Sequence, residues 1–176
     1  MPDISKYKSN ALRGGGIRQN LFRVQGAAKV DGSLSGFLIK SATLPTATVG
    51  EITVPYRGRV IKLPGDRTFE DWEITVISDS TMKLRKEFEK WHNEMNRHIE
   101  NTVQYSEGLY EDWNVTQLDR AGAALRKYDL VGCWPKNLGA MEVAFDTNDT
   151  LAEFTVTLTY QYWTVAAGDA GGTPIS

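Results

Sequence analysis

Four charged residues in the stretch LPGDRTFEDWEITV have side chains that could form a catalytic or metal-binding cluster. Asp66, Glu70 and Asp71 supply carboxylates, which can exchange protons or bind a cation, and Arg67 supplies a guanidinium. However, no histidine lies nearby in the sequence, and Asp71 directly precedes the strand residue Trp72. Arginine binds carboxylates in a fixed orientation, so these residues are predicted to form ion pairs, either within the subunit or with another subunit.

A second acidic segment, DTNDTLAEFTVT, begins like a calcium-binding loop at Asp146. Such a loop needs glycine at its sixth position and glutamate at its twelfth, where this chain has Leu151 and Thr157. The triple glycine at 14–16 lacks the Lys-Ser/Thr that follows in a phosphate-binding loop, so it indicates backbone flexibility.

The histidines and the cysteine do not complete a site either. His92 and His98 are six residues apart, and this spacing does not bring them to one face of a helix. Cys133 is the one cysteine and has no base beside it, which favours a packed thiol over a nucleophile. The sequence therefore predicts no catalytic residue, no metal site and no cofactor, and the chain is not expected to be an enzyme.

The elements that would carry these residues are mostly β-strands. EITVPY and RVIKLP flank Arg57-Gly58, and this pattern predicts a β-hairpin with a tight turn. A second hairpin is predicted around Asp119–Gly122, between WNVTQL and AALRKYDLV. Further strands are predicted at NLFRV, SGFLIKSATL, DWEITVI and MEVAF, whereas GCWPKNLG is predicted to be a turn-rich connection.

The segment EFTVTLTYQYW alternates more clearly than the other strand candidates. Every second side chain from Phe154 to Tyr162 is apolar, which predicts a strand of eleven residues with one face in the core. Polar side chains form its other face, and they are expected to face water or a polar partner: Glu153, Thr155, Thr157, Thr159 and Gln161.

One α-helix is predicted, from about Ser80 to Arg97. Its apolar residues recur at spacings of four, three and four, which is typical of a helix with one buried stripe: Leu84, Phe88, Trp91 and Met95. Asp79 or Ser80 is expected to cap its first turn, because these side chains accept hydrogen bonds from free backbone N–H groups. The predicted fold class is thus mainly β, with a single helix.

Composition and charge agree with a globular domain whose two ends differ in charge. The 176 residues are 41% hydrophobic and 24% charged, and the net charge of −2 argues against general nucleic-acid binding. No apolar run reaches the ~18 residues of a transmembrane helix, so no membrane binding is expected. Residues 1–19 are predicted to form a flexible basic arm, whereas no lysine or arginine follows Lys136. The residues expected to contact a neighbouring subunit are Lys6, Lys8, Arg13, Arg18, Asp66, Arg67, Glu70 and Asp71.

Several segments, in one order along the chain, resemble the tail-tube proteins of contractile-tailed, T4-like bacteriophages. They are NLFRV, SATLPTATVGEITVPYRGRVIKLPGDRTFEDWEITVISD, CWPKN and FTVTLTYQYW. GDRTFEDW is the most specific of them, and the final strand ending in Tyr-Trp comes next. The resemblance covers about Asn20 to Trp163, so it implies a tail-tube domain at 20–163, between the arm at 1–19 and a flexible tail at 164–176.

The resemblance implies an antiparallel two-sheet sandwich or barrel-like domain with one helix on its flank, similar in architecture to the needle proteins of type VI secretion. It also implies a virion protein whose six-fold rings stack into a hollow tube inside a contractile sheath. The implied partners are the sheath, baseplate and tail-terminator proteins, with the tape-measure protein and viral DNA in the lumen. On this interpretation, the polar face of the last strand lines the lumen. An inner tube of a related injection or secretion machine, and a free ligand-binding β module, stay as alternatives.

Deleting residues 1–16 tests the role of the basic arm. A flexible arm that becomes ordered on a neighbouring ring would strengthen stacking, provided that the new contacts exceed the entropic cost of ordering. We expect shorter tubes or none from the truncated chain, with an unchanged thermal unfolding curve of the subunit. Electron microscopy measures tube length, and tubes of normal length and salt tolerance would show that stacking does not depend on the arm.

Overall fold

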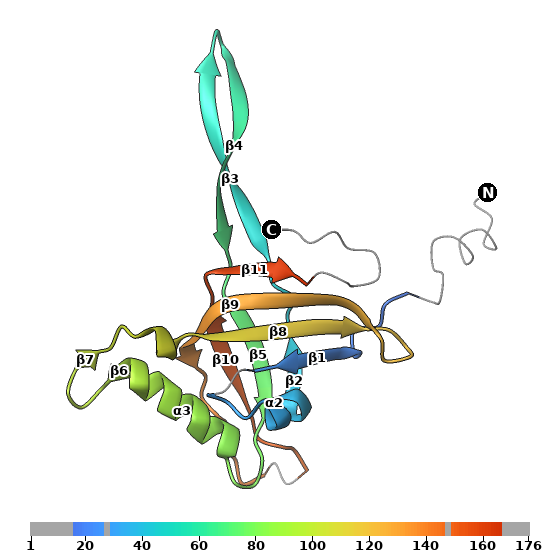
Figure 1. Cartoon of the computed structure of the whole chain (residues 1–176), viewed down its shortest axis with the longest axis vertical. Coiled ribbons are helices and arrows are strands. Elements are labelled where there is room, and N and C mark those ends of the chain that lie inside the picture. Colours follow the sequence, from blue (N-terminus) through green and yellow to red (C-terminus); the bar gives the residue numbers. More distant parts are fainter. Residues whose placement is uncertain (1–15, 27–28, 147–148, 167–176) are drawn as a thin grey trace, which may run out of the picture.

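The computed structural model describes residues 16–26, 29–146 and 149–166, and it shows a strand-rich body from which one long hairpin projects (Figure 1). Two sheets in the body share the long strand β9 (Ala124–Leu138). One sheet consists of β1 (Phe22–Gln25), β8 (Glu111–Leu118), β9 and β11 (Tyr162–Val165). The other consists of β9, β10 (Glu153–Thr159), β5 (Trp72–Ile77) and β2 (Ile39–Ala42). The prediction of a mainly antiparallel β fold with two sheets is confirmed, although the strands do not close into a barrel.

Strand β9 passes from one sheet to the other at Gly132. Residues before it pair with β8 and β11, whereas Trp134 to Leu138 pair with β10. Gly132 has a φ of 68°, a conformation that costs little only for glycine, and its N–H donates to Asp112 Oδ1 at 2.9 Å. The predicted turn-rich connection at GCWPKNLG is therefore wrong, because these residues continue the strand.

The predicted eleven-residue terminal strand is divided in two. β10 ends at Thr159, and β11 begins at Tyr162 in the other sheet, so the chain follows the bend of β9. The alternation is confirmed from Phe154 to Tyr160, whose apolar side chains are buried. It fails at Tyr162, whose side chain is 47% exposed because the break changes the direction in which the following residues point.

The segment SGFLIKSATL is only partly a strand. Its first residues lie in the short helix α2 (Gly32–Leu38), and β2 supplies the strand. Asp31 begins this helix, since its Oδ1 accepts a hydrogen bond from the Leu34 N–H at 3.3 Å and its carbonyl accepts one from the Ser35 N–H at 2.9 Å. The prediction of a single helix is therefore wrong, and so is the strand predicted at MEVAF, which lies in a loop.

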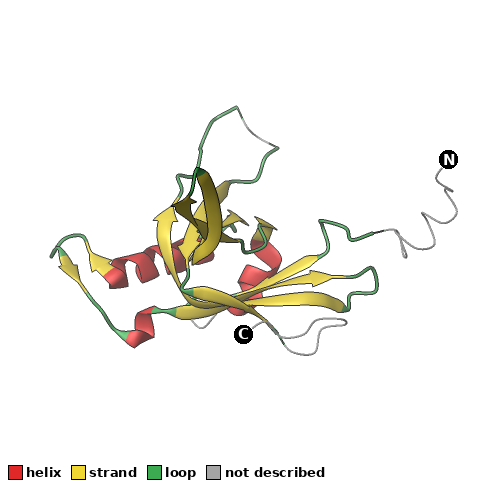
Figure 2. Ribbon diagram, turned by 90° about the horizontal axis from the view of Figure 1, so that it is seen from above, coloured by secondary structure: helices red, strands yellow, loops and turns green. Residues whose placement is uncertain are grey.

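The predicted long helix is confirmed as α3 (Lys83–Met95), shorter at both ends than expected. Asp79 acts at its start as predicted, because its Oδ1 accepts the Lys83 N–H at 3.0 Å. Beyond its end, β6 (Asn96–Arg97) pairs with β7 (Thr102–Val103), and the short 3-10 helix η3 (Glu107–Leu109) leads into β8. Both α-helices lie against the body and away from the hairpin (Figures 1 and 2).

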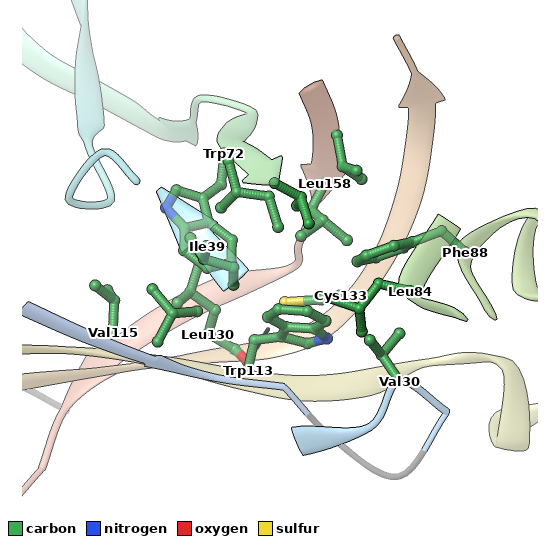
Figure 3. Packing of buried hydrophobic residues seen from close by; sticks show 14 of the residues in the cluster. Val30, Ile39, Trp72, Leu84, Phe88, Trp113, Val115, Leu130, Cys133 and Leu158 are labelled. Carbon is green, nitrogen blue, oxygen red and sulfur yellow. Dashed lines mark hydrogen bonds between the residues drawn. The ribbon is translucent and has the colours of Figure 1, made fainter. Parts of the chain in front are cut away.

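A cluster of aromatic side chains joins α3 to both sheets (Figure 3). The ring of Phe88 lies 6.0 Å from that of Trp113, and Trp113 lies 6.0 Å from Trp72 in an edge-to-face arrangement. Trp91 is 1% exposed, and its indole N–H donates to the Leu109 carbonyl at 2.8 Å. The buried stripe predicted on the helix is thus confirmed as part of the core, with Met95 partly buried at its end.

Two further observations limit the chemistry of the fold. Cys133 is fully buried, and burial raises the pKa of its thiol to about 12, which agrees with a packed thiol. In the described part of the chain, no helix is both long and apolar enough to cross a membrane.

Replacing Trp91 by alanine should destabilise the subunit, because it removes a buried ring and a hydrogen bond to η3. Truncation of a buried tryptophan costs about 3–5 kcal/mol of the free energy of unfolding. Urea unfolding of the dissociated subunit measures this loss, and His92→Ala on the exposed side of the same helix is the matched control. An unchanged unfolding midpoint combined with lost assembly would instead assign Trp91 to an interface.

Candidate assembly surfaces

The long hairpin consists of β3 (Ala47–Tyr56) and β4 (Arg59–Phe69). Arg57 and Gly58 connect the strands with φ angles of 45° and 77°, the combination of a type I′ turn, so the predicted tight turn is confirmed. Every residue of β3 is exposed, as is every residue of β4 except Gly65 and Phe69, which are half-buried. The hairpin therefore lies almost entirely outside the body of its own subunit (Figure 1).

The strand register gives the hairpin one apolar face. Ile52 is opposite Leu63, and Val54 is opposite Ile61, so their side chains point to the same side. Tyr56 follows on this side near the turn, opposite Arg59. The exposed fractions of these five apolar side chains range from 40% to 57%. The other face carries Thr53, Pro55 and the ion pair in which Lys62 Nζ lies 3.1 Å from Glu51.

This apolar face is a candidate contact surface because an isolated two-stranded hairpin is at best marginally stable in water. Apolar side chains contribute to stability only when they leave water, and the described part of the subunit offers this hairpin no surface to pack against. Contiguous exposed apolar patches of this kind mark surfaces that bind another protein.

Most of the charged stretch GDRTFED lies within a strand. Gly65 to Phe69 belong to β4, and only Glu70 and Asp71 lie between β4 and β5. Gly65 lies beside Gly50 at a register shift, and a Cβ on Gly65 would come within 3.2 Å of the Gly50 backbone. Glycine is thus required by the close approach of two strands at a bulge.

The charges of this stretch have different surroundings. Asp66 and Arg67 are exposed on the hairpin, and neither forms an ion pair with any other described residue. Asp71, in contrast, accepts hydrogen bonds from Lys136 Nζ at 2.6 Å and from the Thr159 hydroxyl at 2.8 Å. Both bonds lower the pKa of the Asp71 carboxyl, and the bond from Lys136 has the larger effect. Asp71 therefore holds β9 and β10 together within one subunit.

A polar surface covers the outer side of the second sheet. Glu153, Thr155, Thr157 and Thr159 of β10 are half-buried and alternate with buried apolar residues. Thr155 is opposite Thr75 and Thr157 is opposite Glu73, while Lys40 Nζ lies 2.7 Å from Glu153. The prediction that this face stays out of the subunit core is confirmed for β10, whereas Gln161 lies beyond the end of the strand.

No chemical site adds to these surfaces. Among the described residues, no group of three or more His, Cys, Asp or Glu side chains could hold a metal ion. His98 Nδ1 lies 3.0 Å from the Asn93 side-chain oxygen, and His92 lies on α3. The prominent features are thus an unpartnered apolar hairpin and a polar sheet face, which point to assembly.

Sequence comparison identifies the family to which these surfaces belong. A family model described as phage tail tube protein matches residues 16–166. The chain belongs to the phage tail tube protein family. It is 32% identical over 148 residues to the tail tube protein gp19 of Enterobacteria phage T4, covering 83% of this chain and 90% of that protein. It is also 32% identical over 172 residues to the tail tube protein of Serratia phage KSP90, covering 91% and 95%.

The fold of this tail tube protein also occurs in a contractile injection system. The sheath/tube terminator of the extracellular system PVC, in its extended state, superposes with a TM-score of 0.67 at 17% identity, covering 86% of this chain and 97% of that chain. The family match confirms the resemblance seen in the sequence, and it assigns the protein to the tail tube of a contractile phage tail, as a component of the virion.

The residues predicted to contact neighbouring subunits are only partly placed. Lys6, Lys8 and Arg13 lie outside the described residues. Arg18 is exposed, and its backbone carbonyl accepts a hydrogen bond from the Gln117 side chain at 2.9 Å. The involvement of all eight predicted residues in contacts between subunits stays a prediction. The apolar face of the hairpin was missed, although the alternation in EITVPY and RVIKLP already indicated apolar side chains on one side.

Replacing Asp71 by asparagine should slightly lower the free energy of unfolding, by an amount that depends on pH. The folded-state pKa is lowered, so the stabilisation is present above the unfolded-state pKa of about 3.9 and is lost as the pH falls through the folded value. Because the pair with Lys136 is partly exposed, we expect a loss of about 0.2–1 kcal/mol at pH 7, which shrinks as the pH falls below the unfolded-state pKa.

Urea unfolding at several pH values measures this difference. Asp66→Asn is the matched control, since Asp66 has no ion-pair partner among the described residues. If Asp71→Asn lowers the free energy of unfolding equally at pH 7 and at pH 3, the charge of Asp71 is not the source of the stabilisation.

Proposed function

We propose that this tail tube protein is a non-enzymatic building block whose copies form six-fold rings, and that the rings stack into the hollow inner tube of a contractile tail. The observation that carries the proposal is the apolar face of the β3–β4 hairpin, which remains exposed in the isolated subunit. A virion protein of this family has many identical neighbours, so a second copy of the chain is the available surface on which to bury it.

The edges of the two sheets support lateral joining into a ring. β1, β2 and β11 are edge strands, and each pairs along one side only with other described strands. An open strand edge has free N–H and C=O groups, which are satisfied when a neighbouring subunit adds its own strand. Joining the sheets of six copies would turn an open sheet into a continuous cylinder without exposed edges.

The polar face of β10 suits the lining of the lumen. Its threonines are neutral, and the two lysines near them are paired: Lys40 with Glu153 at 2.7 Å and Lys136 with Asp71 at 2.6 Å. DNA phosphates bind mainly to free lysine and arginine side chains, so such a lining would let the genome pass without being held. The tape-measure protein and viral DNA are the proposed contents of the lumen, and Glu153, Thr155, Thr157, Thr159 and Gln161 are the proposed lining.

The outer surface and ends of the tube would contact the sheath, baseplate and tail-terminator proteins. The tube-forming domain is proposed to lie at 20–163, and β11 continues it to Val165, which is 3% exposed. The segments outside it are proposed as arms. A tube subunit of a related injection machine is the second candidate, because the sheath/tube terminator of such a machine shares the fold.

Electron microscopy and sedimentation of the purified full-length chain test the proposal. We expect hollow rings or tubes, and the smallest assembly should sediment with six times the 19.6 kDa mass of the chain. A free ligand-binding module would instead remain a monomer at every concentration. A persistent monomer, also in the presence of the baseplate on which tubes are built, would overturn the proposal.

A further inference from the structure

The tip of the β3–β4 hairpin combines positive charge with exposed apolar side chains. Arg57 lies in the turn with its guanidinium 5.4 Å from the centre of the Tyr56 ring, and Arg59 follows at the start of β4. Neither guanidinium forms an ion pair with another described residue. Tyr56 and Val60 beside them are 57% and 60% exposed.

The loop between β9 and β10, residues 139–146 and 149–152, has the opposite charge and is also apolar. Val143, Phe145 and Leu151 are at least 70% exposed, which is unusual for such large apolar side chains. The carboxylates of this loop are exposed, and none of them forms an ion pair within the described part of the chain: Glu142, Asp146 and Asp149. An open hollow of about 640 Å³ lies at its base, between Val143, Leu151 and the start of β10 near Thr155.

These two surfaces lie at opposite ends of the molecule. Figure 1 shows the hairpin tip at one end of the longest axis and the β9–β10 loop at the other end. They therefore cannot meet within one subunit. Two different surfaces at opposite ends form a head-to-tail contact, and such a contact repeats without closing and so generates a filament.

We propose that the hairpin tip of one copy docks on the β9–β10 loop of a copy in the next ring. The proposal rests on the stacked rings of the proposed function and names the two surfaces that meet. Tyr56 and Val60 would pack with the apolar side chains of the loop, over the hollow at its base. Arg57 and Arg59 would face Glu142 and the other two carboxylates.

The two kinds of contact would have different roles. Burial of the apolar side chains on both surfaces would hold the rings together, because this contribution grows with the area removed from water. Arginine binds a carboxylate through two parallel hydrogen bonds, so the charges would set the rotation of one ring on the next. Exposed charge pairs are screened by salt, and the charge contribution to stacking should therefore weaken as salt is added.

Charge exchange between the two surfaces tests the proposal. Arg57→Glu with Arg59→Glu should leave single rings but shorten the tubes at least tenfold, and Glu142→Arg with Asp149→Arg should do the same. Combining all four substitutions should restore the tubes, because the complementary charges return with opposite signs. The matched control is Lys90→Glu with Arg120→Glu, which makes the same change in net charge on exposed residues away from both surfaces.

A disulfide between copies gives a readout that does not depend on tube length. Val60→Cys and Val143→Cys, made in separate preparations, would each add one accessible thiol, because Cys133 is buried. After the two preparations are mixed, assembled into tubes and oxidised, we expect a covalent dimer on a non-reducing gel, absent when either preparation is oxidised alone.

The possible results separate this inference from the proposed function. The docking alone would be overturned if the wild-type chain forms tubes but the mixed Val60→Cys and Val143→Cys chains give no disulfide between copies. Tubes of normal length from the Arg57→Glu, Arg59→Glu chain would overturn it as well. Charge reversal on the loop that leaves tubes intact but blocks attachment of the sheath protein would assign the loop to the sheath and would also overturn the docking. A wild-type chain that never forms rings or tubes would overturn the proposed function, and this docking with it.

Discussion

Strand β9 holds the molecule together, because its backbone hydrogen bonds are shared among three partners. Its first part lies between β8 and β11, and its last part pairs with β10. Gly132 lets the same strand pass from one sheet to the other, and the aromatic cluster around Trp113 fills the angle between the sheets. If β9 were straight, the two sheets would lie in one plane and would enclose no core.

The two-sheet body also holds the base of the β3–β4 hairpin in place. β4 leads directly into β5, a buried strand of the second sheet, so the rigid body holds the base of the hairpin while its apolar face stays outside. The subunit thus separates the surface that stabilises the monomer from the surface available to other copies. Such a separation suits an assembling protein, since the folded subunit remains intact when its contacts to neighbours form or dissociate.

The charged residues also separate into those paired within the subunit and those exposed to other copies. Asp71 pairs with Lys136 and Lys40 pairs with Glu153 inside the subunit, and each pair links different segments of the second sheet. The charges near the hairpin tip and in the β9–β10 loop have no such partners among the described residues. Charges that have partners in their own chain add little to recognition, whereas unpaired ones on opposite ends can orient a neighbour.

The sequence by itself determined the elements whose signal is local. The 3.6-residue stripe of α3, the Arg57-Gly58 turn and the alternation from Phe154 to Tyr160 each follow from spacing within a few residues. The motifs around GDRTFEDW also indicated the family, which the family match confirms. Asp31 precedes α2 and accepts a hydrogen bond from the Leu34 N–H, but the apolar residues that follow favoured a strand.

Only the tertiary structure decided how the strands are shared between the sheets. Gly132 and Pro135 have the composition of a turn, yet they lie within β9 because β10 supplies hydrogen bonds on one side and a bulge accommodates the proline. For the same reason the last strand breaks at Tyr160–Gln161, and Gly65 serves a close approach to Gly50 that is fifteen residues away in sequence. Local pattern cannot predict these features, because each depends on hydrogen bonds and contacts with a strand that is distant in the sequence.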